Sequence, residues 1–241
     1  MSVMAAIVGL TLRGLLGRRR MLLMLLLAGL PVLVGLLIRL GGGREDASGI
    51  LDTLGIRTVL PLIALVVGTA AIGSEIEDGT LVYLLIKPIP RWRTALAKLA
   101  VAVGLTLVLA IPPLLVTGLL TAGTGGDGPR LTFGFALAAM AGGAAYAVAF
   151  TALGSLTSRA LVVGLAYTLL WEGVLAGLLE GTRFLSVRQA TLGIVARLTG
   201  EDVGLDPLDA TVSVTMIVLT VVIGFLLTTA ALRRFQVRAG D

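Results

Sequence analysis

Cysteine and histidine are both absent from this chain of 241 residues. Without cysteine there are no disulfides and no thiol nucleophile. Without histidine there is no Ser-His-Asp triad, no His-ligated zinc and no His proton relay. Carboxylate-only or Ser-Lys chemistry stays open, although no motif in the chain supports it. The two absences therefore argue against an enzyme and against a metal centre.

Charge is scarce as well. Asp, Glu, Lys and Arg make up 14% of the chain, whereas a soluble domain carries about a quarter. There is no GxxxxGK[ST] phosphate-binding loop, so any ATP must be bound by another polypeptide. The first 12 residues hold no Lys or Arg before their apolar run, so no cleavable signal peptide is expected.

Long apolar runs are what the chain has in abundance. Hydrophobic residues make up 57% of it, and the mean hydropathy is +1.03. A helix needs about 20 apolar residues to cross a bilayer core. We therefore predict an all-α integral membrane protein, one domain over residues 1–241, with the second span following a polar loop. The six expected transmembrane spans are residues 21–38, 58–76, 99–120, 131–156, 160–179 and 210–232.

Two segments outside the spans are patterned for helices. Residues 3–17 are apolar but too short to cross, which predicts an amphipathic helix in the inner interface; a loosely attached tail is the alternative. In residues 180–209, apolar side chains fall near one helical face, which predicts a short helix against the outer interface.

The distribution of basic residues predicts the orientation. With the N-terminus inside, 12 of the 19 Lys and Arg residues fall on the cytoplasmic side and 7 on the outer side. An excess of Lys and Arg marks cytoplasmic loops. We therefore expect both termini in the cytoplasm. The basic clusters at 18–20 and 233–238 flank spans, so they predict contact with membrane lipid and no nucleic acid.

Residues 73–99 form a polar stretch between two apolar spans. Ser74 and Glu77 have the spacing of a capping box, which predicts a new helix start. Asp78-Gly79 offers a turn, and Pro88 and Pro90 break the pattern that follows. These features predict a short rigid helix held at the membrane surface, whereas the alternative is an ordinary charged loop.

These residues carry a family resemblance. The motif runs Glu75-x-x-Asp78-Gly79-Thr80-Leu81-x-x-Leu84-Leu85-x-x-Pro88-x-Pro90-Arg91 and is followed by Ala97-Lys98-Leu99. It resembles the signature of permease subunits of type-2 ATP-binding-cassette (ABC) transporters, E-x-x-x-G-T-L-x-x-L-L-x-x-P-x-x-R before the third span. The pattern of six spans agrees over essentially the whole chain, but only residues 74–99 are specific. Ala97 stands where the family often has glycine.

The resemblance implies partners and a mechanism. Such permeases pair with a second copy or a paralogue and bind two cytoplasmic ABC ATPase subunits, which hold the ATP and Mg²⁺, so no cofactor is expected on this chain. We interpret the chain as the permease of an exporter in a bacterial plasma membrane that works by alternating access. The coupling helix that docks on the ATPase would comprise Glu75, Glu77, Asp78, Gly79, Thr80, Leu81, Leu84, Leu85, Pro88 and Arg91.

Glu172 lies within the expected fifth span. An ionisable group at membrane depth is a functional hypothesis by default. It would face the translocation path or cap the broken outer end of its helix, where Gly173, Gly177 and Gly181 follow. Alternatively, the span ends early and Glu172 touches the outer water.

Other functions predict other residues. An ion-gradient-driven secondary carrier or channel would need several ionisable groups at mid-membrane, and apart from Glu172 the spans have almost none. An intramembrane enzyme is disfavoured by the missing His and Cys. A non-transporting scaffold stays open, and the sequence does not indicate the cargo.

Overall fold

The computed structural model of the protein describes residues 8–9, 11–12, 14–15, 17–41, 47–77, 90–123, 125–175, 185–201 and 208–238. Within those ranges every regular element is a helix and none is a strand. A helix pairs its own backbone N–H and C=O groups, which the bilayer core requires because it offers no water. The all-helical prediction is confirmed for the described part of the chain.

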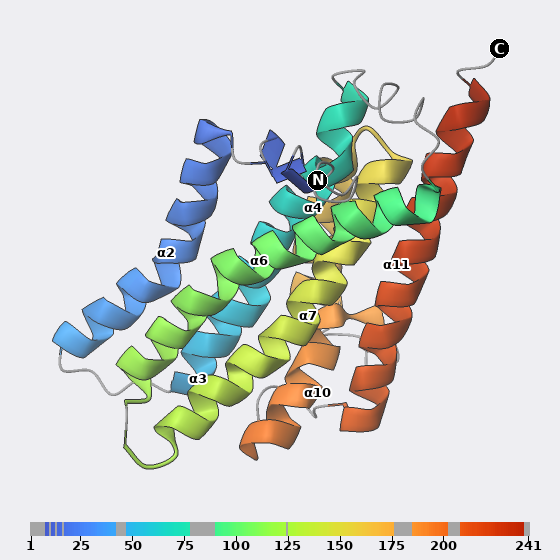
Figure 1. The fold of residues 1–241 in the computed structure, drawn as a ribbon. Coiled ribbons are helices and arrows are strands. Elements are labelled where there is room, and N and C mark those ends of the chain that lie inside the picture. The colour runs from blue at the N-terminus through green and yellow to red at the C-terminus, as the bar shows by residue number, and fades with distance from the viewer. Residues whose placement is uncertain are drawn as a thin grey trace.

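The elements form one bundle (Figure 1). In chain order they are α2 (Arg18–Leu40), α3 (Ala47–Ile50), the π-helix η1 (Leu51–Val59), α4 (Leu60–Glu77), α6 (Arg91–Thr121), α7 (Gly128–Leu156), α8 (Ala160–Ala166), the π-helix η2 (Tyr167–Leu175), α10 (Val187–Thr199) and α11 (Ala210–Arg238). α7 lies at the centre, where it contacts α4, α6, α10 and α11. In Figure 1, α2 begins and α11 ends at the upper end of the bundle, whereas α10 lies at the lower end.

Five described helices are long and apolar enough to cross a membrane: Arg20–Leu40, Ala47–Gly73, Arg91–Thr121, Gly128–Leu156 and Ala210–Arg234. The protein is therefore a multi-pass membrane protein. The expected fifth span, 160–179, corresponds to a shorter apolar helix, Ala160–Val174. The count of six spans stays a prediction because this helix is short for a full crossing.

The second span begins well before the expected residue 58. α3, η1 and α4 follow one another without a break from Ala47 to Glu77, so the expected polar loop before residue 58 is wrong. The sequence favoured a loop because Asp52 and Arg57 are costly in a span. Both side chains have hydrogen-bond partners on other elements, which is why a helix tolerates them. α6 also begins early, at Arg91, because Pro90 is compatible with a helix start.

The short helix expected within residues 180–209 exists as α10, but it is packed inside the bundle. It contacts α7 and α11, and 9 of its 13 residues are buried. Ser186 caps its start by accepting a hydrogen bond from the N–H of Gln189 at 3.2 Å. Gly200, with φ 75°, ends it in the left-handed conformation. Its position against the outer membrane interface stays a prediction.

α7 and α10 approach each other closely at two glycines of α7. A Cβ added at Gly134 would collide with Thr199, and one added at Gly142 would collide with Thr191. The spacing is eight residues on both helices, so the two contacts repeat along one antiparallel seam. Small residues permit such close packing of helices in a membrane.

Gly142→Ala is therefore expected to destabilise the protein by about 1–3 kcal/mol, the usual cost of overpacking a tight contact. Thr191 cannot easily give way, because its hydroxyl donates to the carbonyl of Val187 at 2.8 Å. Thermal unfolding in detergent measures the effect. Gly104→Ala is the matched control on α6, where an added Cβ meets nothing within 4 Å. An equal loss in both variants would show that the α7–α10 seam is not responsible.

α11 starts at a capped end. Asp209 Oδ1 accepts a hydrogen bond from the backbone N–H of Thr211 at 2.7 Å. That bond lowers the pKa of the exposed Asp209 carboxyl below its ordinary value. The negative charge is thus kept at the helix N-terminus, where the helix dipole favours it.

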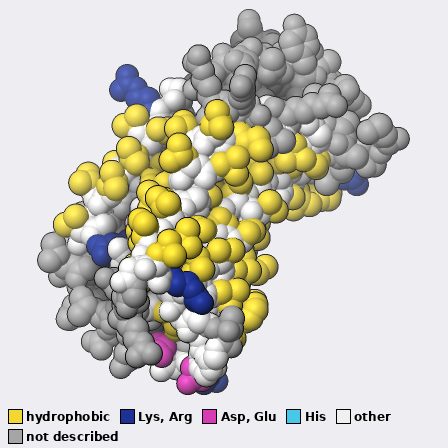
Figure 2. Space-filling view, turned by 90° about the vertical axis from the view of Figure 1, so that its left-hand side faces the viewer, with side chains coloured by type: hydrophobic (Ala, Val, Ile, Leu, Met, Phe, Trp, Pro, Cys, Tyr) yellow, Lys and Arg dark blue, Asp and Glu magenta, His cyan; other side chains and the backbone are white. Residues whose placement is uncertain are grey.

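The outside of the bundle is apolar. On α2, Leu23 and Leu26 are 67% and 73% exposed, and on α11 Val218 and Ile223 are about half exposed. Figure 2 shows hydrophobic side chains over the middle of one face, and the described Asp and Glu side chains visible in this view lie at its lower end. A soluble protein rarely exposes such a continuous apolar surface, whereas a protein surrounded by lipid does.

The segment expected as an interfacial helix, 3–17, is described only in part. Residues 8–9, 11–12 and 14–15 are helical, and Leu15 is buried in the core. Its position at the membrane interface stays a prediction.

Candidate functional site

The expected coupling helix falls on the connection between α4 and α6. Glu75 and Glu77 belong to the last turn of α4, and Arg91 is the first residue of α6. The other expected docking residues lie outside the described residues: Asp78, Gly79, Thr80, Leu81, Leu84, Leu85 and Pro88. The coupling helix therefore stays a prediction, and what the structure describes is how its two flanking helices are held.

A buried lysine joins these two helices. Lys98 of α6 is 0% exposed, and its Nζ donates to the carbonyl oxygen of Ala71 on α4 at 3.1 Å. A buried ammonium is costly unless it is hydrogen-bonded. The contact fixes α6 to α4, six residues before the end of α4 and seven residues after the start of α6.

The start of α6 is anchored differently. The N–H of Arg93 donates to the carbonyl of Pro90 at 3.0 Å, which closes the first turn. Trp92 is 45% exposed, and the Arg93 guanidinium lies 5.3 Å from its ring centroid. An exposed Trp beside Arg is typical of a helix entering the membrane interface.

The second candidate site surrounds Glu172 in η2. Its side chain is only 4% exposed. Oε2 accepts a hydrogen bond from the hydroxyl of Tyr146 on α7, and Oε1 lies 2.9 Å from the hydroxyl of Tyr167. Oε1 also accepts from the backbone N–H groups of Val187 and Arg188, at 3.0 and 3.4 Å.

Glu172 thus caps the start of α10. The two amides belong to its first turn, where the intrahelical ladder supplies no acceptor. A carboxylate at this position satisfies them and interacts favourably with the helix dipole. The sequence analysis did not predict this role for Glu172. Its side chain is buried, so it does not touch the outer water, and it caps α10 and not its own helix. Its place on a translocation path stays a prediction.

Two arginines extend the network around Glu172. Arg188 of α10 forms an ion pair with Asp52 of η1, with Nη2 and Oδ2 2.8 Å apart. Arg57 of η1 donates from Nη2 to the carbonyl of Gly173 at 2.9 Å. η1 is thereby tied both to α10 and to η2.

The network coincides with the two π-helical segments. Asp52 and Arg57 lie in η1, whereas Tyr167, Glu172 and Gly173 lie in η2. π-helical turns are rare and occur frequently at functional sites. Among the described residues, no group of three or more His, Cys, Asp or Glu residues that could hold a metal ion occurs. What the network provides is a fixed connection between four elements.

Sequence reasoning found Glu172 and missed its partners. Asp52, Arg57 and Arg188 were assigned to loops or to the outer helix, and Tyr146 and Tyr167 were not singled out. The sequence did contain one signal for these partners. Asp52, Arg57 and Arg188 are opposite charges beside apolar spans on the same side of the membrane, where ionisable residues usually pair. Lys98 was expected on the cytoplasmic side, as one of its basic residues and as part of the family motif, and its burial was not predicted.

The chain was compared with known proteins. A family model described as ABC-2 family transporter protein matches residues 41–161, half of the chain. The match runs from the end of α2 to the start of α8 and includes the α4–α6 connection and Lys98. No curated protein matches the chain.

Proposed function

The chain belongs to the ABC-2 family of transporter proteins, and from this premise we propose that it is the permease of an ATP-driven exporter. As an ABC permease it is a transport subunit that spans the membrane. In the proposal, two cytoplasmic ABC ATPase subunits bind the ATP and Mg²⁺, and a second permease copy or a paralogue completes the pathway. The complex lies in a bacterial plasma membrane, with both termini of this chain in the cytoplasm.

The observation that carries the proposal is the α4–α6 connection. It lies inside the matched range, it bears the family motif, and the two helices that it joins are held together by the Lys98–Ala71 contact. We assign ATPase docking to residues 75–91. Carboxylates at the end of α4 would offer charge complementarity to basic groups on the partner. The motif residues from Asp78 to Pro88 would supply the rest of the contact.

A route for the motion follows from the fixed contacts. Because Lys98 holds α6 on α4, a displacement of residues 75–91 would move both helices together. α4 continues into η1, whose Asp52 is paired with Arg188 on α10 and whose Arg57 binds Gly173 of η2. Coupling travels through packed elements and hydrogen-bonded networks of this kind. In the proposal, ATP-driven closure therefore reaches the opposite end of the bundle.

One observation favours the alternative, an ion-gradient-driven carrier. Glu172 is a buried carboxylate at membrane depth, as proton-coupled carriers use. Its two oxygens, however, already accept hydrogen bonds from two tyrosines and two backbone amides. Such a carboxylate is suited to holding helices in place. The exporter remains the better-supported function.

The orientation can be tested cleanly because the chain has no cysteine, so any introduced cysteine is unique. Trp92→Cys at the start of α6 and Asp127→Cys before α7 form a matched pair at exposed positions. In intact cells, a membrane-impermeant maleimide should label Asp127→Cys and leave Trp92→Cys unlabelled until the cells are opened. The reverse pattern would place residues 75–91 outside, where no cytoplasmic ATPase could dock.

Energy coupling needs its own measurement. We expect the chain, reconstituted in liposomes with its ABC ATPase partner, to move cargo only while ATP is hydrolysed. Transport by the permease alone along an ion gradient would instead establish the carrier.

A further inference from the structure

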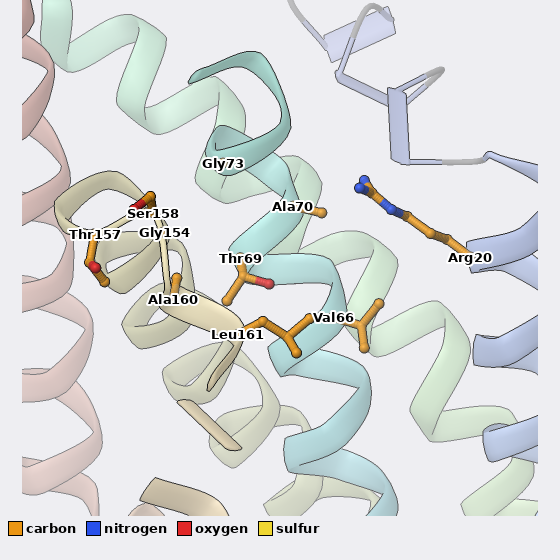
Figure 3. A pocket seen from close by; sticks show the side chains of 10 residues that line it. All are labelled: Arg20, Val66, Thr69, Ala70, Gly73, Gly154, Thr157, Ser158, Ala160 and Leu161. Carbon is orange, nitrogen blue, oxygen red and sulfur yellow. The ribbon is translucent and has the colours of Figure 1, made fainter. Parts of the chain in front are cut away.

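A pocket opens at the end of the bundle opposite to α10, between α2, α4 and the α7–α8 turn (Figure 3). Its volume is about 130 Å³, roughly ten times the space one water molecule needs. It is lined by Arg20, Val66, Thr69, Ala70, Gly73, Gly154, Thr157, Ser158, Ala160 and Leu161. The network around Glu172 contributes none of these residues, so the pocket is a separate feature.

The ends of four apolar helices fix the depth of the pocket. Arg20 begins one candidate span, Gly73 ends the next, and Ala160 begins the short apolar helix. Gly154 and Thr157 flank the end of a further span at Leu156. Helix ends of this kind lie where the hydrocarbon core meets the lipid headgroups. The pocket is therefore at headgroup level on one side of the membrane.

The polar part of the lining suits an anion. Arg20 extends from α2 toward α4, as Figure 3 shows, and two hydroxyl groups, of Thr157 and Ser158, stand on the other side. Thr157 Oγ1 accepts a hydrogen bond from the N–H of Arg159 at 3.2 Å, which leaves its own proton to donate. None of the described residues that line the pocket is acidic. A guanidinium with hydroxyl donors and no carboxylate matches a phosphate group.

The apolar part of the lining suits a lipid. Val66, Ala70 and Leu161 form walls without hydrogen-bonding side chains. Leu161 is 51% exposed, and it is followed along α8 by the exposed Val162 and Val163. An acyl chain could continue from the pocket along this surface without meeting a polar side chain.

We infer that this pocket binds the phosphate group of an anionic phospholipid, with Arg20 as the principal ligand. In the proposed orientation the pocket faces the cytoplasmic leaflet, which carries the anionic lipids, and basic pockets between helices on that side bind their headgroups. The choice of an anionic lipid rests on that proposed orientation, whereas the proposal does not depend on ATPase coupling.

Native mass spectrometry of the purified full chain, titrated with dioleoylphosphatidylglycerol, tests the proposal. One lipid per chain should bind preferentially, and zwitterionic phosphatidylcholine should bind more weakly. Arg20→Gln should weaken phosphatidylglycerol binding about tenfold or more, because the charged donor is lost. Arg20→Lys should weaken it less. Arg39→Gln, at the other end of α2, is the matched control and should bind like the wild type.

A second variant keeps the test independent of charge. Gly73 lines the pocket, and a Cβ added there meets nothing within 4 Å, so Gly73→Leu adds a side chain at the pocket without a clash at its Cβ. It should reduce lipid binding as Arg20→Gln does, with an unchanged melting temperature.

Three outcomes would overturn the proposal. Unchanged binding in both Arg20→Gln and Gly73→Leu would show that the lipid sits elsewhere. An equal loss in Arg39→Gln would indicate general surface attraction. Competition by inorganic phosphate or glycerol phosphate at the same concentration as the lipid would identify a site for free phosphate.

Discussion

Replacing Glu172 by leucine is expected to destabilise the protein by about 3 kcal/mol or more, through several buried donors that lose their acceptor. Tyr167 keeps an alternative acceptor, the carbonyl of Leu185 at 3.2 Å. Tyr146 and the amides of Val187 and Arg188 lose the oxygen to which they donate. The measurements are thermal unfolding in detergent and hydrogen exchange of the first turn of α10, which should accelerate.

Two further variants separate capping from simple loss of charge. Glu172→Gln keeps one acceptor oxygen, so it should lose less stability than Glu172→Leu. Glu201→Leu is the matched control, because Glu201 is an exposed carboxyl group just after α10, and its change should stay within about 0.5 kcal/mol. If Glu172→Leu melts like the wild type and its α10 amides stay protected, Glu172 does not hold α10.

A double-mutant cycle with Tyr146→Phe measures the interaction itself. Residues in one hydrogen-bonded network show coupling energies of about 0.5–3 kcal/mol, whereas independent sites add. Removing Tyr146 should therefore matter much less once Glu172 has been replaced. Simple additivity would mean that the two side chains act separately, despite their contact.

Most of the fold could be predicted from the long apolar runs of the sequence. Runs such as 21–38 and 210–232 are long, free of charge and bounded by charged residues, and the structure has helices there. The physical constraint is strong, because a bilayer admits few other solutions for such runs. The prediction of a loop before residue 58 was wrong for the same reason, because Asp52 and Arg57 were assumed to be excluded from a membrane helix. Whether a charged residue can stay in a helix depends on its partner, and Arg188 lies 136 positions from Asp52.

The candidate sites could also be predicted only in part. Glu172 stands out in sequence because an ionisable group at membrane depth is unusual. Its role as a cap of α10 depends on the start of that helix, 15 residues away, and on Tyr146 of α7. The burial of α10 was also out of reach, because its seam with α7 is made by Gly134, Gly142 and two threonines, which carry no hydrophobic signal.

The largest functional effect is expected from changes in residues 75–91, to which ATPase docking is assigned. Glu75→Ala combined with Asp78→Ala is expected to uncouple ATP hydrolysis from transport while membrane insertion stays intact. Losing one member of a buried charged pair at an interface costs about 2–5 kcal/mol. At 1.4 kcal/mol per factor of ten, ATPase association should weaken about tenfold or more. Pull-down of the ATPase, ATP turnover and vesicle transport, measured on the same preparation, check this.

Asp127→Ala combined with Glu201→Ala is the matched control, since it removes two exposed carboxyl groups away from the α4–α6 connection. Its transport rate should match the wild type. Lys98→Met then separates docking from transmission: it leaves residues 75–91 intact but removes the ammonium that holds α6 on Ala71. ATPase association should survive in this variant and transport should fall. If the Glu75/Asp78 double variant binds ATPase and transports like the wild type, docking must be assigned to another surface. If Lys98→Met also transports normally, the α4–α6 contact serves the fold alone.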